Sequence, residues 1–236
     1  MNEKESHTDC MVCGSDLNYD SVASKKNCYI CGDIFDSNIY CVNSHYVCDQ
    51  CHIDSPIGVI KKFCMNTKIT DPVELALTLM RNKKVKMHGP EHHFLVAAVL
   101  ITSYYNFKND MEGKLKKIET AEKRASKVPG GFCGFFGTCG AAVGSGIFIS
   151  AITGSTPVAI KEWHLCNLMT SKSLNTIANK GGPRCCKRNT LLAIYEAVNF
   201  LREHFDTKLE VIEDIKCEFN HLNKECIKQK CPYYPQ

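Results

Sequence analysis

Residues 130–160 read GGFCGFFGTCGAAVGSGIFISAITGSTPVAI and contain no charged side chain. An uncharged run of this length is long enough to span a bilayer. However, glycine, serine and threonine interrupt the run every few residues, and no belts of aromatic and basic residues mark its ends. We therefore predict a glycine-rich loop followed by a central apolar helix that is buried among other helices, and no membrane span.

Helical patterns lie on both sides of this run. Thr70 or Asp71 can cap a helix that starts at Pro72, and Pro90 suits the first turn of a second helix. Apolar residues recur at spacings of three and four, except in 113–127, where the expected helix is charged on most sides. The predicted helices cover residues 72–80, 90–107, 113–127, 174–180, 189–205 and 209–222.

The 16 cysteines divide the chain in two, because eight precede residue 65, eight follow residue 132, and the interval between has none. Residues 1–66 are polar and rich in turns, with short β-type runs at 27–30 and 38–42. We expect this part to be a small β-rich module that needs metal to fold. Residues 67–236 are expected to form an α-helical domain, which makes the predicted fold class mainly α.

The module contains four pairs of metal-ligating residues, three of them C-x2-C and one C-x3-H. Two of the C-x2-C pairs are followed by glycine, as in knuckles whose backbone amides point at zinc-bound thiolates. Eight ligands of this kind fill two structural zinc sites. The expected zinc ligands are Cys10, Cys13, Cys28, Cys31, Cys41, His45, Cys48 and Cys51. His52 and Cys64 are expected to be bystanders.

The run CYICGDIFDSNIYCVNSHYVCDQC at residues 28–51 resembles the first six ligand positions of a RING-type cross-brace. The last C-x2-C pair of a RING is missing, and Cys10 and Cys13 can supply it from upstream. Counted along this chain, the first pair then shares a metal with the third pair, Cys41 and His45. The second pair, Cys28 and Cys31, shares a metal with the fourth pair, Cys48 and Cys51. The alternative is sequential, with the first two pairs in one site and the last two in the other. Neither arrangement implies ubiquitin ligase activity, because a fold is not a function.

A second set of cysteines follows near the C-terminus. Cys217, Cys226 and Cys231 form the pattern C-x8-C-x4-C-P, and Cys185 and Cys186 stand side by side upstream. Proline after the last cysteine also occurs in ferredoxin motifs. We predict an iron–sulfur cluster of the 4Fe-4S type, with its fourth ligand from one of the two adjacent cysteines. A third structural zinc and plain core cysteines are the alternatives.

Two further motifs contain candidate catalytic residues. Five glycines around Cys133 and Cys139 let the backbone approach a ligand closely, and the helix expected after them favours a thiolate or a bound anion at its start. His88, Glu91 and His92 crowd the start of another helix, where they can handle protons. The alternatives are close helix packing at the glycines and an ordinary capped helix start at the histidines.

The motifs HGPEHHFLVAAVL, GGFCGFFGTCGAAVGSGIFIS and GGPRCCKRN, with the terminal C-x8-C-x4-CP, resemble an uncharacterised cysteine-rich domain family of anaerobic archaea and bacteria. Members of that family are sometimes joined to methyltransferase-type domains. The resemblance implies a cytoplasmic protein of an anaerobe with a metal-dependent role, and a methyltransferase as partner; a redox protein is the partner that an iron–sulfur role would need. It implies no particular reaction and no residue role.

Two functional hypotheses from different classes follow. The first is an iron–sulfur protein for redox or sulfur-transfer chemistry on a small or sulfur-containing substrate. The second is a zinc-binding adaptor or scaffold that binds a protein or nucleic acid without catalysis. A basic face for nucleic acid would use Lys83, Lys84, Lys86, Lys114, Lys116 and Lys117. A third and weaker hypothesis, a methyl-group or metal carrier, rests on the family's domain partners alone.

Charge and the start of the chain bear on partners and location. The net charge of +4 does not by itself indicate nucleic acid, since a basic footprint needs its charges on one face. The first ten residues, MNEKESHTDC, have no apolar run of the kind found in a signal peptide, so we expect a cytoplasmic location.

Overall fold

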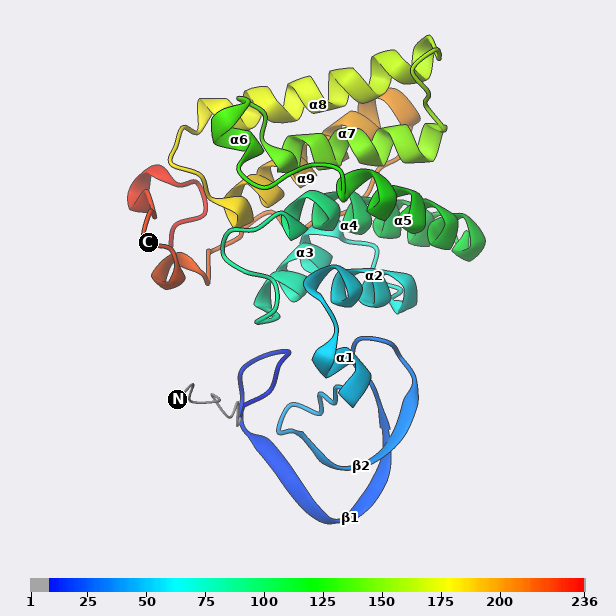
Figure 1. The fold of residues 1–236 in the computed structure, drawn as a ribbon, viewed down its shortest axis with the longest axis vertical. Helices are drawn as coiled ribbons and strands as arrows, with labels where there is room; N and C mark the ends of the chain where they lie inside the picture. The colour runs from blue at the N-terminus through cyan, green and yellow to red at the C-terminus, as the bar shows by residue number, and fades with distance from the viewer. Residues whose placement is uncertain (1–8, 236) are drawn as a thin grey trace.

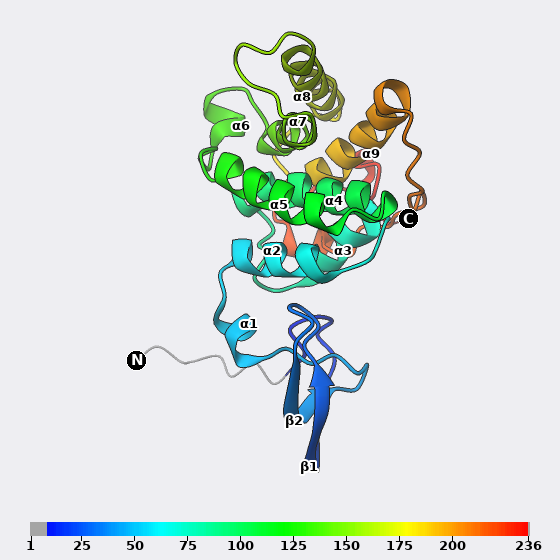
Figure 2. The ribbon, with the colours of Figure 1, turned by 90° about the vertical axis from the view of Figure 1, so that its right-hand side faces the viewer.

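The computed structural model describes residues 9–235 and has a mainly α fold. Figure 1 shows a small N-terminal part, which contains a β-hairpin, below a larger body of helices. The view from the side in Figure 2 shows the same division, with α2 and α3 facing the N-terminal part and α8 farthest from it. The predicted mainly α class is confirmed.

A two-stranded antiparallel hairpin is the main regular structure of the N-terminal part. β1 (Leu17–Asn27) pairs with β2 (Ile34–Cys41), and the register shifts between Tyr19 and Ser24. A short helix, α1 (Asp49–Ile53), follows. The hairpin has few buried side chains, so the clusters of cysteine beside it form most of the core of this part.

Of the two β-type runs in the sequence, one forms a strand and the other forms a turn. Most of the run at 38–42 lies in β2, as predicted. The run at 27–30 is not a strand, because Cys28 begins a tight turn. In that turn the backbone N–H of Gly32 donates to the carbonyl oxygen of Cys28, and Gly32 has a φ of 78° that glycine adopts without strain.

The helical body begins with α2, which the sequence analysis missed. The helices are α2 (Pro56–Asn66), α3 (Pro72–Arg81), α4 (Glu91–Phe107), α5 (Met111–Ala125), α6 (Phe132–Phe135), α7 (Gly140–Thr153), α8 (Lys161–Asn179) and α9 (Cys186–Phe205), with 3-10 turns at Asn220–Leu222 and Lys228–Lys230. Five predicted helices correspond to α3, α4, α5, α8 and α9, although α8 starts thirteen residues before the predicted 174–180. The predicted helix at 209–222 is not formed.

Helices α4 and α7 form the centre of the body. Every residue of α4 from Glu91 to Tyr105 is buried, and the helix packs against α2, α3, α5, α7 and α9. The uncharged run forms the predicted buried helix, α7, after a glycine-rich loop. A Cβ at Gly144 would lie 2.6 Å from the carbonyl oxygen of His93, so glycine allows α7 to approach α4 closely. No helix among the described residues is long and apolar enough to cross a membrane.

Helix α2 contributes to both hydrophobic cores. Val59 packs with the buried cysteines of the N-terminal part, whereas Ile60, Phe63 and Cys64 belong to the core of the helical body. The predicted domain boundary at residue 66 falls at the C-terminal end of this helix. The N-terminal part is thus anchored to the body through this shared helix and through contacts such as the ion pair between Lys83 and Asp9.

The segment after α9 is extended where the sequence indicated a helix. Leu209, Ile215 and Phe219 are buried in the main core, and the backbone N–H of Ile212 donates to Asp71 at the start of α3 with an N···O distance of 2.8 Å. Burial of these side chains along the body outweighs the local helical pattern, since propensity is a weak preference that tertiary packing overrides. This extended course brings Cys217 beside the start of α9.

Candidate metal centres

The first cluster of metal-ligating side chains joins Cys10 and Cys13 to Cys41 and His45. Their ligand atoms all lie within 4.8 Å of one another. The Sγ atoms of Cys13 and Cys41 are 3.5 Å apart, which is close to the spacing of about 3.8 Å that a tetrahedral zinc with 2.3 Å Zn–S bonds requires. Burial alone would raise the pKa of the Cys13 thiol, but hydrogen bonds from Ser15 and Asn43 lower it to about 5.

The second cluster joins the C-x2-C pair of the turn after β1 to the pair around the start of α1. Cys28, Cys31, Cys48 and Cys51 again place their sulfur atoms within 4.8 Å of one another. The Sγ atoms of Cys31 and Cys48 are 3.9 Å apart, and the backbone N–H of Cys48 donates to Cys28. Both clusters are able to bind a metal ion such as zinc.

The four pairs are therefore interleaved in space. The first pair in the chain meets the third, and the second meets the fourth, as in a cross-brace. Of the two arrangements that the sequence left open, the sequential one is wrong. The hairpin explains the pairing. β1 leads the chain away from Cys10 and Cys13, and β2 returns it to them at its last residue, Cys41.

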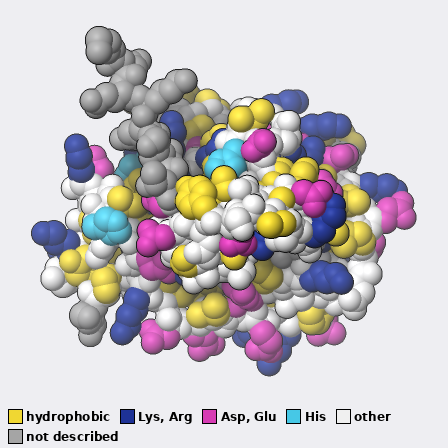
Figure 3. Space-filling model, turned by 90° about the horizontal axis from the view of Figure 1, so that it is seen from below, with side chains coloured by type: hydrophobic (Ala, Val, Ile, Leu, Met, Phe, Trp, Pro, Cys, Tyr) yellow, Lys and Arg dark blue, Asp and Glu magenta, His cyan; other side chains and the backbone are white. Residues whose placement is uncertain are grey.

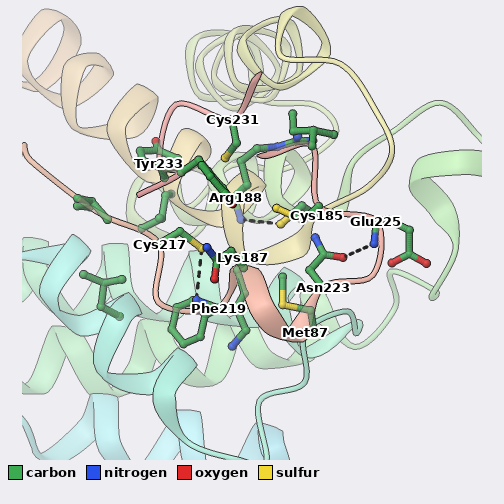
Figure 4. Close-up of a pocket in the computed structure, with 17 residues that line it drawn as sticks. Met87, Cys185, Lys187, Arg188, Cys217, Phe219, Asn223, Glu225, Cys231 and Tyr233 are labelled. Atoms are coloured by element: carbon green, nitrogen blue, oxygen red, sulfur yellow. Dashed lines mark hydrogen bonds between the residues drawn. The ribbon is translucent and has the colours of Figure 1, made fainter. Parts of the chain in front are cut away.

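Four cysteines from the far end of the chain line a pocket in the helical body. They are Cys185, Cys217, Cys226 and Cys231. Figure 4 shows the pocket between the start of α9 and the C-terminal segment, with Cys185, Cys217 and Cys231 around it. The cavity has a volume of about 30 Å³, room for one or two water-sized groups.

Three of these thiols accept backbone N–H hydrogen bonds. Arg188 donates to Cys185, Phe219 to Cys217 and Lys228 to Cys226, each with an N···S distance of 3.4 Å. The N-terminal clusters contain the same arrangement, where Val12 donates to Cys10 and Asn43 to Cys41. Such donors stabilise negative charge on sulfur.

The spacing of the pocket thiols differs from that of the N-terminal clusters. Within residues 9–235, no three pocket thiols have their sulfur atoms all within 4.8 Å of one another. A single tetrahedral ion holds its sulfur atoms about 3.8 Å apart. A cluster of several irons accommodates a wider set, because each thiolate binds a different iron.

Two basic residues of α9 line the same pocket. Arg188 is 4% exposed, and its Nη1 is buried without a hydrogen-bond partner among the described residues. Its Nη2 donates to the carbonyl oxygens of Gly181 and Pro183. Burial lowers the pKa of Lys187 to about 8, and its Nζ donates to the carbonyl oxygen of Met80. Arg188 thus lines the pocket and has one buried donor with no acceptor among the described residues.

The two adjacent cysteines at the start of α9 point to different places. Cys185 lines the pocket, whereas Cys186 lies near Gly89 and Cys139. Burial raises the pKa of Cys186 to about 11, the backbone N–H of Gly89 opposes this shift, and the negative charge of Cys139 adds to it. Asn189 donates its side-chain amide to Cys139 with an N···S distance of 3.4 Å. Of the two candidates for a fourth ligand, the structure places Cys185 with the other three.

The predicted proton-handling residues lie around the turn before α4, each with different partners. His88 lies at the rim of the pocket, where its Nε2 is 3.1 Å from Asn223 Oδ1 and 3.5 Å from Glu225 Oε2. Glu91 accepts from the backbone N–H of Lys86 in the turn before α4.

His92 is a core residue whose two ring nitrogens are both occupied. They contact Thr190 Oγ1 and the carbonyl oxygen of Lys86, and burial lowers the pKa of His92 to about 4. Cys133 lies half-buried on α6. Among the predicted catalytic residues, His88 lies beside the pocket. Cys139 lies outside it and accepts a hydrogen bond from Asn189, the residue after Arg188.

Arg188, Asn189 and Lys187 were missed as site residues. In the motif GGPRCCKRN, the sequence analysis predicts only the cysteines as site residues. The basic residues directly after the cysteine pair indicate a buried anionic group. Asn223 and Glu225 had no such signal, because the region around them was expected to form a helix that ends before the site.

The fold and the sites define a mainly α, cysteine-rich protein with two clusters that are able to bind metal. A family model described as "Family of unknown function (DUF5714)" matches residues 60–234, and the chain belongs to this family. The match contains the four-thiol pocket, Cys139 and Cys186, whereas the two N-terminal clusters lie before it. No curated protein and no solved structure matches the chain.

Proposed function

We propose that the chain is an iron–sulfur protein whose cluster is held by Cys185, Cys217, Cys226 and Cys231, with two structural zinc ions in the N-terminal part. The observation that carries the proposal is the convergence of these four thiols, from two distant segments, on one pocket with a buried arginine. No three of their sulfur atoms in residues 9–235 lie within 4.8 Å of one another, which argues against a third tetrahedral zinc. The cavity of about 30 Å³ holds a cluster only if the lining side chains move apart when it binds.

The charges around the pocket support an anionic occupant. Four thiolates and the cluster sulfides together are negative, and a buried negative charge needs donors and counter-charges nearby. Three backbone N–H groups and the two basic residues that line the pocket, Lys187 and Arg188, supply them. A pocket of plain core cysteines would not need these groups and would leave Arg188 unsatisfied.

The chemistry that suits such a site is electron delivery or sulfur transfer. A cluster beside protein thiols can pass electrons or bind sulfur, so the proposed substrate is a small or sulfur-containing molecule. A redox protein or a methyltransferase is the proposed partner. The location in the cytoplasm of an anaerobe, which the sequence resemblance implies, fits an oxygen-sensitive cluster.

The test is metal analysis of protein purified without oxygen. We expect about two zinc and about four iron per chain, visible absorption, and a paramagnetic signal on reduction. Cys217→Ala should remove iron and colour and leave zinc unchanged. The matched control is Cys166→Ala, because Cys166 is a half-buried cysteine of α8 outside the pocket. Zinc alone, with no iron after reconstitution, would refute the proposal.

The alternative function, an adaptor, has one observation in its favour. A groove of about 580 Å³ lies against the N-terminal part, lined by β2 residues such as Ile39 and Tyr40 together with Lys83 and Lys84. A protein segment is the occupant that such a groove suits. A partner that binds equally well to the wild type and to the iron-free Cys217→Ala protein would favour the adaptor.

A basic face for nucleic acid has little support. Lys114 is fully buried, and the Nζ of Lys83 bonds to Asp9. Lys116 pairs with Glu112 on its own helix. Figure 3 shows acidic and basic side chains interspersed over the N-terminal end of the molecule, with no extended patch of one sign. A binding constant for nucleic acid that falls steeply with salt would contradict this conclusion.

A further inference from the structure

Five exposed basic residues surround the four-thiol pocket. They are Arg184, Lys216, Lys224, Lys228 and Lys230. Each is within two residues of a thiol that lines the pocket, so each side chain begins at most about 8 Å along the chain from a lining residue. Figure 1 shows the loop before α9 and the C-terminal segment, which carry these residues, at the same side of the helical body.

These five cations differ from most other basic side chains in having no acidic partner. Eight lysine and arginine side chains elsewhere in residues 9–235 form ion pairs, and none of the five does. Two acidic residues are equally close to the pocket thiols in the chain. Glu218 pairs with Arg81, and Glu225 lies 3.5 Å from Nε2 of His88. The exposed surface around the pocket therefore carries an excess of positive charge.

The pocket lies close to this basic surface. All four of its thiols are half-buried, so a cluster bound to them would lie just below the exposed cations. Leu222, which is 58% exposed and two residues before Lys224, adds an apolar side chain to the same segment. Redox proteins that exchange electrons bind through small interfaces, where complementary charge speeds and orients the encounter.

We propose that this basic surface docks an acidic electron-transfer protein, which passes one electron at a time to the cluster in the pocket. In each transfer the partner is oxidised by one electron, the cluster is reduced by one electron, and no covalent bond forms or breaks. The electron transfer rests on the proposed iron–sulfur function, and the experiments below test the docking separately from it.

The extent of the basic surface favours a protein over a nucleic acid as the occupant. The surface is short, because the exposed acidic residues Glu213 and Asp214 precede Lys216 on the same segment. A nucleic acid needs a longer stripe of basic residues that follows its phosphates. An acidic protein needs only a few cations around the point where the electron enters.

The first experiment measures the rate of electron transfer. Full-length protein, purified without oxygen, is mixed in a stopped-flow instrument with reduced plant-type ferredoxin, an acidic one-electron donor. We expect a second-order rate constant that falls steeply as salt rises from about 20 to about 300 mM. The triple variant Lys224→Gln, Lys228→Gln, Lys230→Gln should lower this constant at low salt by at least about tenfold. Glutamate at the same three positions should lower it further.

The matched control removes the same charge elsewhere. Lys68→Gln, Lys123→Gln, Lys161→Gln changes three exposed lysines that are distant in the chain from every residue lining the pocket, and it should keep the rate constant within about twofold. Dithionite, a small donor that needs no docking surface, should reduce the wild type and both triple variants at similar rates. Equal losses in the two triple variants would reflect net charge alone and would overturn the docking surface. Loss of iron from the pocket variant would assign its lysines to the cluster and have the same effect.

The second experiment measures binding of oxidised ferredoxin to the wild type and to both triple variants, with metal content determined in parallel. We expect binding that weakens with salt and that the pocket variant alone weakens, by at least about tenfold. Wild type that contains zinc alone and still binds in this way would refute the proposed function and leave the docking surface standing. Iron-loaded wild type that does not bind ferredoxin would overturn the docking surface alone. Tighter binding of duplex DNA than of ferredoxin at the same salt would assign the surface to nucleic acid and also overturn the proposal.

Discussion

The N-terminal clusters and the C-terminal pocket are both built from cysteines, but they are organised differently. Each N-terminal cluster gathers four ligand atoms within 4.8 Å, and the pairs come from one stretch of 42 residues, 10–51. The pocket joins Cys185 to three cysteines more than thirty residues later, with wider spacing and two basic residues beside them. Closed clusters suit stabilising ions, and less closely spaced thiols beside basic side chains suit a reactive group.

The two regions also differ in what else stabilises them. The core of the N-terminal part consists largely of the ligands themselves, with Ile30, Val12 and Val59 among the few additions. The pocket lies against the main core, to which Cys217 and Cys231 are packed. Metal removal should therefore unfold the first region and leave the second region folded.

The largest effect is expected from the loss of a ligand in the second N-terminal cluster. Cys51→Ala should unfold most of residues 9–54, because structural zinc contributes about 10 kcal/mol or more to such small modules. Limited proteolysis should then cut the N-terminal part and spare the helical body. His52→Ala, an exposed neighbour, is the control. Equal protease resistance of Cys51→Ala and wild type would contradict the role of metal in folding.

The next effect concerns the proposed anionic occupant of the pocket. Arg188→Leu should lower the free energy of unfolding of the iron-loaded protein by about 3 kcal/mol more than that of the iron-free protein, because it removes a buried donor to a buried negative charge. Anaerobic urea unfolding of both forms measures the difference. Arg184→Leu, which changes an exposed arginine just before α9, should show no such difference. A larger loss in the iron-free form would argue against an anionic occupant.

A smaller effect is expected from pH in the helical body. Burial lowers the pKa of His92 from 6.5 to about 4, so the unfolded chain binds this proton more readily than the folded chain between these values. Stability from His92 is complete above about pH 6.5 and falls as the pH drops towards 4, by about 2 kcal/mol at pH 5. Urea unfolding of the wild type and His92→Gln at pH 7 and pH 5 measures this dependence. Identical losses in both proteins would contradict it.

Local sequence patterns predicted the parts of the molecule that depend on local interactions. The start of α3 follows from Asp71 and Pro72, and the eight ligands of the N-terminal part follow from pair spacing. Glycine interruptions in residues 130–160 correctly indicated a helix packed against other helices. These features are determined by residues close together in the chain.

The rest depends on contacts between distant segments. The course of residues 209–222 is decided by burial of Leu209 and Ile215 against the body, which no local pattern reveals. The opposite directions of Cys185 and Cys186 follow from where α9 begins relative to α7 and the C-terminal segment. The missed helix α2 begins at Pro56 with Ser55 as its cap, a signal that was present but fell within a region expected to be irregular.

The smallest effect should come from the ion pair that links α3 to the C-terminal segment. Arg81 contacts Glu218, the residue after Cys217, with an Nε···Oε2 distance of 2.9 Å, and both side chains are more than 40% exposed. Exposed pairs of this kind contribute at most about 1 kcal/mol. Arg81→Ala should therefore lower the free energy of unfolding by less than that amount, as measured by urea unfolding, and retain iron. If iron were lost, the ion pair, rather than the buried side chains of the segment, would be what positions Cys217 in the pocket.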